Sequence, residues 1–187
     1  MANADIVKGF VPVKHPSGHI RTTRYSIPAS DGTALFIGDL VKSDGSSDAD
    51  GVPGVIQAAA GNYVRGAIVS FEPLLSNLTT MHRTASTLRY CYVADDPDQV
   101  FECQEDGVGG ALALASVGLN AEFIVAAGSA TTGLSGMELD TNTAATTNTL
   151  SLKILGFVQR PDNEPAVANA KVLVRINLHE LDYTTGV

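Results

Sequence analysis

Residues 88–104 read LRYCYVADDPDQVFECQ and hold the clearest structural signal in the chain. Two runs rich in aromatic and β-branched residues, 88–94 and 99–104, are separated by Asp95-Asp96-Pro97-Asp98, residue types that are typical of tight turns. If this four-residue loop closes symmetrically, period-two alternation gives one apolar face, made of Tyr90, Tyr92, Phe101 and Cys103. The stretch therefore predicts an antiparallel hairpin whose aromatic face lies in a core.

The same register predicts the state of the two cysteines. It places Cys91 on the face opposite Cys103, whereas bridged cysteines need Cβ atoms that approach within about 4.5 Å. We therefore predict that both thiols are free, as is usual for a protein that assembles in a reducing cytoplasm.

Further strand-like runs lie on both sides of this stretch. Each is short, rich in apolar residues and bounded by turn-forming residues: 33–37, 40–42, 55–58, 64–71, 120–126, 150–159 and 172–179. The one stretch with a helical pattern, residues 111–117, is short and ends at Gly118. The pattern predicts a mostly β chain that forms an antiparallel sandwich or a barrel-like fold with at most one short helix.

The composition is that of an ordered body. The chain has 187 residues, of which 44% are hydrophobic and only 17% charged, the balance of a folded chain rather than a disordered one. This length can bury a core without the help of metals or disulfides. We expect a single β-rich domain over residues 31–187, preceded by an extended N-terminal arm over residues 1–30.

The arm differs from the body in charge. Residues 1–30 hold four Lys and Arg residues against one Asp, a net charge of +3, which leaves −11 for residues 31–187 within the total of −8. An extended basic segment on an acidic body can pack on its own body or on a neighbouring subunit, and it can also simply fray.

The charge and hydropathy patterns exclude two classes of partner. An acidic body is repelled by phosphates, and no basic footprint covers a whole face, so we expect no nucleic-acid partner. No run approaches the roughly 18 to 20 apolar residues that span a bilayer, and residues 1–14 lack the apolar centre of a signal peptide. We therefore expect no membrane partner and no secretory route.

No combination of residues specifies catalysis, a metal or a cofactor. Residues 133–136 lack the G-x-S-x-G spacing of a hydrolase nucleophile, and residues 107–110 lack the glycine spacing of a phosphate-binding loop. The acidic run 44–51 lacks the alternate ligands and the later Glu of a calcium loop. His15 and His19 are the only close pair of histidines, and the predicted register separates the cysteines, so no zinc ligand set forms. We expect a protein without enzymatic activity.

Segments spread over nearly the whole chain carry a more specific signal. They are MANAD (1–5), GFVPV (9–13), RYSIP (24–28), TALFIGDLV (33–41), VADDPDQVFECQ (93–104) and ILGFVQRPDNE (154–164). In these segments the chain resembles the virion structural proteins of tailed bacteriophages, and among them the cement or decoration proteins of the capsid.

The resemblance implies a small β-rich protein on the outer surface of a phage head, reached after synthesis in the cytoplasm of the host bacterium. Such a protein clamps neighbouring subunits of the major capsid protein and forms homo-oligomers, dimers or trimers, at local symmetry axes. Because it binds only the assembled shell, it would stabilise that shell by mass action. No segment of the resemblance has a catalytic role.

On this interpretation the arm supplies the contacts with the capsid or between subunits. The residues expected there are Lys8, Phe10, Lys14, Arg21, Arg24 and Tyr25. Phe10 and Tyr25 could instead pack on the parent sheet. The alternative function is a carbohydrate- or receptor-binding β module of a phage tail or tip, although the chain has no Trp to stack on a sugar.

Overall fold

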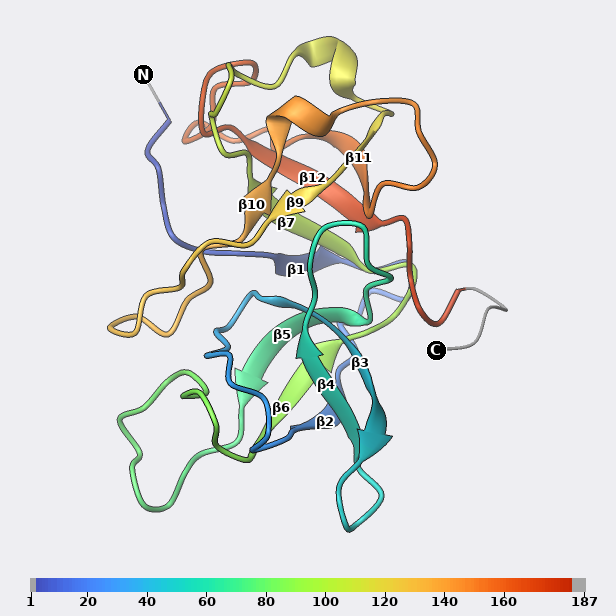
Figure 1. The fold of residues 1–187 in the computed structure, drawn as a ribbon. Helices are drawn as coiled ribbons and strands as arrows, with labels where there is room; N and C mark the ends of the chain where they lie inside the picture. Colours follow the sequence, from blue (N-terminus) through green and yellow to red (C-terminus); the bar gives the residue numbers. More distant parts are fainter. Residues whose placement is uncertain (1–2, 183–187) are drawn as a thin grey trace.

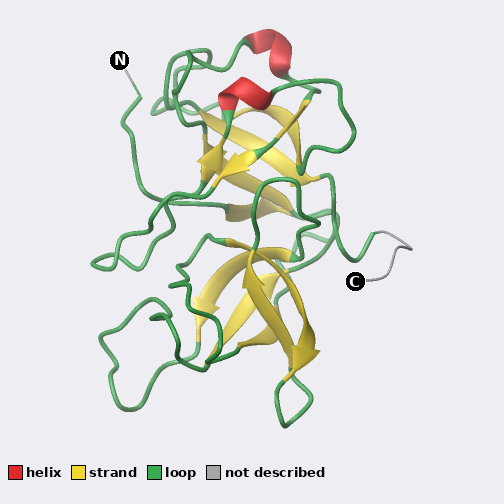
Figure 2. Cartoon of the chain, viewed as in Figure 1, coloured by secondary structure: helices red, strands yellow, loops and turns green. Residues whose placement is uncertain are grey.

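The computed structural model describes residues 3–182 and confirms a mostly β chain (Figure 1). The strands form a closed barrel in the order β2-β4-β3-β5-β6, next to an open five-stranded sheet in the order β1-β7-β12-β11-β8. A two-stranded ribbon, β10-β9, lies against one side of the open sheet (Figure 1). Figure 2 shows how little of the chain is helical: residues 3–182 contain two short 3-10 helices, η1 (Leu114–Ser116) and η2 (Thr141–Thr143).

The strands are short, as the sequence predicts. The barrel consists of β2 (Thr23–Ile27), β3 (Leu40–Ser47), β4 (Pro53–Gln57), β5 (Gly66–Phe71) and β6 (Arg89–Ala94). The open sheet consists of β1 (Val11–Lys14), β7 (Val100–Gln104), β8 (Asn120–Ala121), β11 (Leu152–Phe157) and β12 (Lys171–Ile176), and the ribbon of β9 (Phe123–Ile124) and β10 (Glu138–Leu139). Within residues 3–182, β2 and β4 are the one parallel pair of strands.

Two apolar clusters hold the molecule together. The barrel encloses the first, which contains Tyr25, Ile27, Leu35, Val41, Val55, Ile68, Cys91 and Val93. The second lies between the open sheet, the ribbon and one end of the barrel, and its members include Phe10, Phe101, Phe123, Met137, Leu139, Leu152 and Ile154. Because Leu40, Ala67 and Ala94 of the barrel strands belong to this second cluster, the barrel and the sheet form one continuous body.

The predicted hairpin between residues 88–94 and 99–104 is wrong. β6 pairs with β2 and β5 in the barrel, whereas β7 pairs with β1 and β12 in the open sheet. Each strand is therefore hydrogen-bonded on both edges, which leaves neither edge for the other. Residues 95–98 do form a turn, in which the Gln99 amide donates to the Asp96 carbonyl at 3.0 Å, but this turn carries the chain from one sheet to the next.

The predicted core face is wrong for β6 and right for β7. Phe101 and Cys103 point into the second cluster as expected. In β6 the alternation is inverted, since Cys91 and Val93 fill the barrel while Tyr90 and Tyr92 are only half-buried. The prediction of free thiols is confirmed, because both cysteines are buried and unbridged, each in a different cluster.

The N-terminal segment is built into the same body. Residues 3–8 run along the open sheet without forming a strand, and two side chains hold them there. Gln104 Nε2 donates to the Ala4 carbonyl at 2.7 Å, and Asn3 Nδ2 donates to the Glu164 carbonyl at 3.0 Å. The segment then supplies β1 to the open sheet and β2 to the barrel. Met1 and Ala2 of the expected arm lie outside the described residues.

Candidate interaction surface

The open sheet has one buried face and one exposed face. Along β12, Val172 and Val174 point into the core, so Lys171, Leu173 and Arg175 point to the other side. That outer face is accessible to solvent: Leu155 of β11 is 44% exposed, and the Arg175 side chain is 43% exposed. A sheet face that is held on its rear side by a core is a preformed surface.

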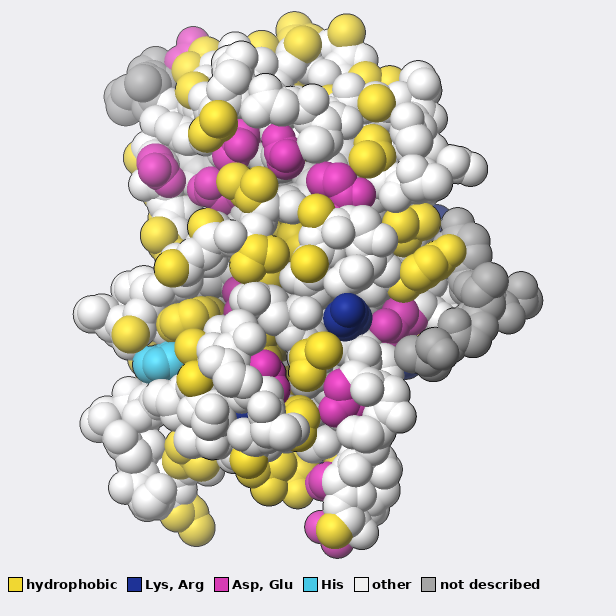
Figure 3. All heavy atoms as spheres, in the orientation of Figure 1, with side chains coloured by type: hydrophobic (Ala, Val, Ile, Leu, Met, Phe, Trp, Pro, Cys, Tyr) yellow, Lys and Arg dark blue, Asp and Glu magenta, His cyan; other side chains and the backbone are white. Residues whose placement is uncertain are grey.

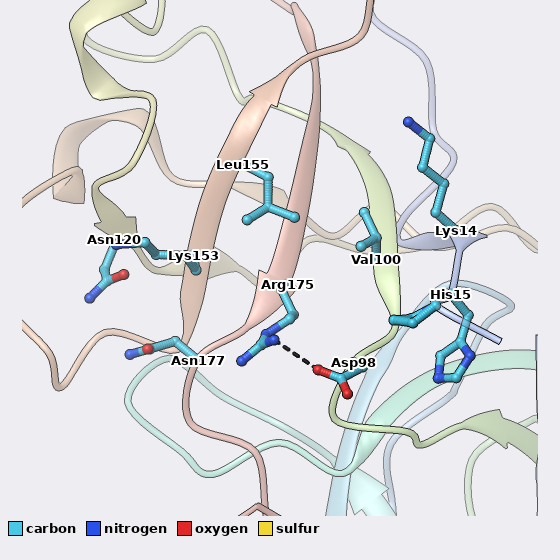
Figure 4. Close-up of a pocket in the computed structure, with 10 residues that line it drawn as sticks. Lys14, His15, Asp98, Val100, Asn120, Lys153, Leu155, Arg175 and Asn177 are labelled. Carbon is cyan, nitrogen blue, oxygen red and sulfur yellow. Dashed lines mark hydrogen bonds and ion pairs between the residues drawn. The ribbon is translucent and has the colours of Figure 1, made fainter.

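A row of five residues crosses this face from one edge of the sheet to the other. The strand register places Lys14 opposite Val100, Val100 opposite Arg175, Arg175 opposite Lys153, and Lys153 opposite Asn120. Figure 4 shows these side chains on one side of the sheet, with Arg175 directed towards Asp98. The row therefore brings together three cations from strands that are far apart in the sequence.

A shallow hollow of about 600 Å³ is centred on this row. Its lining residues are Lys14, His15, Pro16, Asp98, Val100, Asn120, Lys153, Leu155, Arg175 and Asn177 (Figure 4). One carboxylate, Asp98, accepts a 2.9 Å hydrogen bond from Arg175 Nη1. The hollow therefore combines apolar and cationic side chains, and its ten lining residues include no Phe, Tyr or Trp.

A second group of charges lies beside the row, around Glu102. Lys8 Nζ donates to Glu102 Oε1 at 2.7 Å, and Arg160 forms a bidentate pair with the same carboxylate at 2.8 and 2.9 Å. Burial opposes ionisation of Glu102, but the hydrogen bonds from Arg160 and Lys8 outweigh it and hold its pKa below the usual range. Glu102 therefore stays charged and fixes both cations in place.

Asp162 has the same role for Lys171. The hydrogen bonds from Lys171 and then Arg160 lower the pKa of Asp162 to about 2. Arg160 Nε lies 3.1 Å from Asp162 Oδ1, so one guanidinium contacts both Glu102 and Asp162. The charged side chains along this part of the sheet are ordered by their partners.

The outer face is basic on an acidic protein. Six of the 12 Lys and Arg residues of the chain lie on it or at its edge, together with Asp98, Glu102 and Asp162, and Asp96 lies 3.0 Å from His15 Nε2 beside the hollow. The six cations are Lys8, Lys14, Lys153, Arg160, Lys171 and Arg175. Figure 3 shows the side of the molecule that carries the ribbon, where Asp and Glu predominate.

The structure brings two of the six predicted contact residues to this surface, Lys8 and Lys14. Phe10 is 1% exposed and Tyr25 is 3% exposed, so both are core residues of this chain. Arg24 lies on the outer wall of the barrel, where its Nε is 2.6 Å from Glu72 Oε1, and Arg21 is exposed between β1 and β2. The predicted residues therefore do not form one site.

Sequence reasoning missed Lys153, Arg160, Lys171 and Arg175. Lys171 and Arg175 occupy alternate positions of β12, and Lys153 lies in β11. Strands are predicted over residues 150–159 and 172–179, so the alternation of their side chains was a usable signal for an exposed face. What the pattern did not contain was the order of the strands, which places these cations next to Lys14.

In residues 3–182, no three His, Cys, Asp or Glu side chains are grouped so that they could hold a metal ion. The helices described there also include none with the length and hydropathy of a membrane span.

Comparison of the chain with protein-family models, with curated proteins and with solved structures gave no match.

Proposed function

We propose that this chain is a structural protein that binds a partner protein through the basic outer face of its open sheet. The observation that carries the proposal is the gathering of half of the chain's cations on one exposed face of an otherwise acidic molecule. The resemblance of the sequence to cement proteins supplies the partner: the major capsid protein of a tailed phage, on the outer surface of the head. A role without catalysis or cofactor is part of the same proposal.

The physical character of the face suits a protein partner. Lys14, Arg175 and Lys153 are presented in one line by hydrogen-bonded strands, so little conformational freedom of the backbone is lost on binding. Val100 and Leu155 lie between the cations and offer apolar area that a partner can cover. Cations around an apolar centre favour an acidic protein surface and set its orientation.

The same face explains how such a protein would stabilise a shell. Binding energy that is available only when neighbouring capsid subunits are assembled shifts the equilibrium towards the assembled state. The N-terminal segment of residues 3–8 is held on the open sheet by the bond from Gln104 to the Ala4 carbonyl. It contributes Lys8 to this face and is therefore a fixed part of the surface.

The test is co-sedimentation of the purified protein with heads assembled from the major capsid protein encoded in the same genome. We expect saturable binding that salt weakens, and heads that open at a lower temperature without the protein. The double variant Lys153→Glu, Arg175→Glu should bind at least tenfold more weakly, a loss of about 1.4 kcal/mol or more.

The matched control is Lys42→Glu combined with Arg24→Glu. It changes the net charge by the same amount, but both residues belong to strands of the barrel, outside the outer face of the open sheet. Its binding should equal that of the wild type, and circular dichroism should show both variants folded. Equal losses in the two double variants would reject this face as the binding surface, and the absence of any binding to heads would reject the cement proposal.

A second candidate, a carbohydrate-binding module, is favoured by one observation. Asn120 and Asn177 bring amide oxygens to the hollow that holds Asp98 and Arg175, while their Nδ2 atoms already donate to carbonyls of residues 147–150. The hollow has no aromatic platform for a sugar ring, which makes this candidate the weaker one. Binding to polysaccharide of the host surface, lost in Asn177→Ala, together with no binding to heads would establish it.

A further inference from the structure

The hollow on the outer face has more positive than negative charge in its lining. Its fully charged lining residues are three cations and one carboxylate: Lys14, Lys153, Arg175 and Asp98 (Figure 4). Three positive charges minus one leave +2. Asp96 lies beside the hollow, where His15 Nε2 and the Asp98 amide already bond to its carboxylate. A ligand that fills the hollow is therefore expected to carry two negative charges.

The cations of the hollow can pair with carboxylates from outside the chain. Within residues 3–182, Lys14 Nζ has no partner, and the Arg175 guanidinium donates from Nη1 alone, to Asp98. Lys153 donates to the Gly118 carbonyl, which is a neutral group. Two carboxylates of a ligand can thus bind these cations without breaking an ion pair of the chain.

The order of the strands sets the distance between the two ends of the row. Because β7 lies between β1 and β12 and neighbouring strands are about 4.8 Å apart, Lys14 is about 10 Å from Arg175. It is about 12 Å from the point midway between Arg175 and Lys153. Val100 lies between them on the same face. The row therefore presents a cation, an apolar side chain and a pair of cations, in that order.

An extended peptide that crosses the strands matches this order. Its residues advance by about 3.3 Å, so side chains at positions i, i+2 and i+4 point to one side and span about 13 Å. A carboxylate at position i reaches Lys14, and an apolar residue at i+2 covers Val100. A carboxylate at i+4 reaches Arg175 and Lys153, and the flexible stem of Lys absorbs the small difference in length.

Two amide oxygens in the hollow favour an extended segment over a helix. Asn177 Nδ2 donates to the carbonyls of Asn148 and Leu150, which leaves Oδ1 as the group that Asn177 presents. Asn120 is 6% exposed, and its Oδ1 has no donor in residues 3–182. An extended peptide offers backbone N–H groups to such oxygens, whereas a helix uses its own N–H groups internally.

We infer that the hollow binds an extended acidic segment of a partner protein, in which two Asp or Glu residues stand four positions apart with an apolar residue midway. The segment crosses the strands along the row from Lys14 to Lys153, and one of its backbone N–H groups donates to Asn177 Oδ1. The inference rests on the proposed function for one point, that the outer face is the binding surface. It adds which element of the partner this face receives.

Titration of the isotope-labelled full chain with synthetic peptides, followed by NMR at low ionic strength, tests the spacing. The probe peptide has blocked ends, two Glu residues four positions apart, Val midway between them and Ser elsewhere. We expect saturable shifts of amides in β11 and β12, and binding that is weaker by about fivefold or more when the two Glu residues are adjacent. Gln in place of both Glu residues should abolish the shifts.

Variants of the chain test the residues that bind the probe peptide. Lys14→Gln and Lys153→Gln should each weaken binding by about fivefold or more, because each removes one cation of the row. Lys42→Gln is the matched control, since Lys42 belongs to β3 of the barrel, and it should leave binding unchanged.

Methylation of the peptide's backbone nitrogens, one at a time, tests the extended shape. One methylated position should weaken binding to the wild type but not to Asn177→Ala, because the bond to Asn177 is then already lost. If no position shows this dependence on Asn177, the bond from a backbone N–H group does not form and the extended segment is rejected.

Heads of the major capsid protein separate this inference from the proposed function. Displacement of the protein from heads by the probe peptide would support both. If the protein binds heads through Lys153 and Arg175 but saturating peptide does not displace it, the extended segment is rejected and the proposed function stands. Binding of the peptide without any binding to heads would do the reverse. Equal affinity for spaced and adjacent Glu residues, or no saturable shift at all, would overturn the inference.

Discussion

The Tyr25 hydroxyl donates a 2.7 Å hydrogen bond to Asp95 Oδ2. Tyr25 belongs to β2, and Asp95 is the first residue after β6, where the chain leaves the barrel for the open sheet. The other oxygen of the same carboxylate accepts from Thr23 Oγ1 at 3.0 Å, so both bonds come from β2. Burial, and then the bond to Asp95, raises the pKa of Tyr25, which keeps the phenol protonated and able to donate.

Replacing Tyr25 by Phe should destabilise the fold by about 1–3 kcal/mol, because it leaves a buried carboxylate oxygen without its donor. Urea unfolding measures the loss. The matched control is Tyr90→Phe, since the Tyr90 hydroxyl also lies 2.7 Å from a carboxylate, that of Asp48, but on the half-buried outer wall of the barrel. We expect less than about 1 kcal/mol there. Equal effects of the two substitutions would contradict the role of the Tyr25–Asp95 bond.

The same bond shows where prediction from the sequence stops. The alternation in residues 88–94 and 99–104 correctly predicts two strands, and Asp95-Asp96-Pro97-Asp98 correctly predicts a turn. Period-two alternation of side chains does not show which strands pair, because the backbone groups of one strand can form hydrogen bonds with the edge of any other strand. The pairing of β6 with β2 and β5, and of β7 with β1 and β12, shows that the turn joins two sheets, and Asp95 at its start bonds to residues of β2 that are far away in sequence.

Prediction of the interaction surface fails for a related reason. The basic character of residues 1–30 predicts a contact site in this segment, and Lys8 and Lys14 do lie on the basic face. Phe10 and Tyr25 are contact candidates as members of the expected arm, with packing on the parent sheet as the alternative, and the structure buries both in the core. Lys153 and Arg175 join the surface only through the strand order of the sheet.

Arg83 should be the most sensitive charged residue of the barrel. Its side chain is fully buried, and its guanidinium donates to the carbonyls of Thr87, Thr33, Pro28 and Asp31 as well as to the Asp31 carboxylate. Arg83→Lys cannot reproduce a planar set of donors, so both Arg83→Lys and Arg83→Ala should cost about 3–5 kcal/mol in thermal or urea unfolding.

Arg24→Lys provides the comparison for Arg83, because Arg24 is paired with Glu72 at the surface and its side chain is 40% exposed. It should change stability by no more than about 1 kcal/mol. If Arg83→Lys unfolded at the same urea concentration as the wild type, the carbonyl contacts of Arg83 would not contribute to stability as the structure implies.

Glu138 should make the stability depend on pH. Burial, and then the nearby charges of Asp5, Asp106 and Glu105, raises the pKa of Glu138 from 4.5 to about 7. The folded state thus binds a proton more tightly than the unfolded state, so stability from this group is present below about pH 4.5 and is lost as the pH rises to about 7. Glu138→Gln should be the more stable protein at pH 8, and the difference should vanish below pH 4.5.

The melting temperature of wild type and Glu138→Gln between pH 4 and pH 8 measures this difference. His179 acts with the opposite sign, because burial lowers its pKa from 6.5 to about 4, so its contribution is present above pH 6.5 and is lost as the pH falls through 4. Both proteins contain His179, and subtracting their curves removes its effect. Parallel curves over the whole range would show that Glu138 does not titrate differently in the folded state.

The two thiols should be unreactive as long as the protein is folded. Burial, and then the charge of Glu72, raises the pKa of Cys91 to about 12, and burial raises the pKa of Cys103 as well. Both cysteines are at most 1% exposed, so a disulfide reagent must wait for the structure to open. We expect them to react at least about a thousandfold more slowly in the native protein than in urea.

Ala130→Cys gives the positive control for this measurement, because Ala130 is exposed and its thiol should react at once in the native protein. Oxidation of the folded wild type should produce no bridge between Cys91 and Cys103, since one lies inside the barrel and the other beneath the open sheet. Rapid reaction of Cys91 or Cys103 with the disulfide reagent in the native protein would mean that its apolar cluster opens far more often than a continuous core allows. A bridge between them would mean that the two clusters open far enough for the buried thiols to meet.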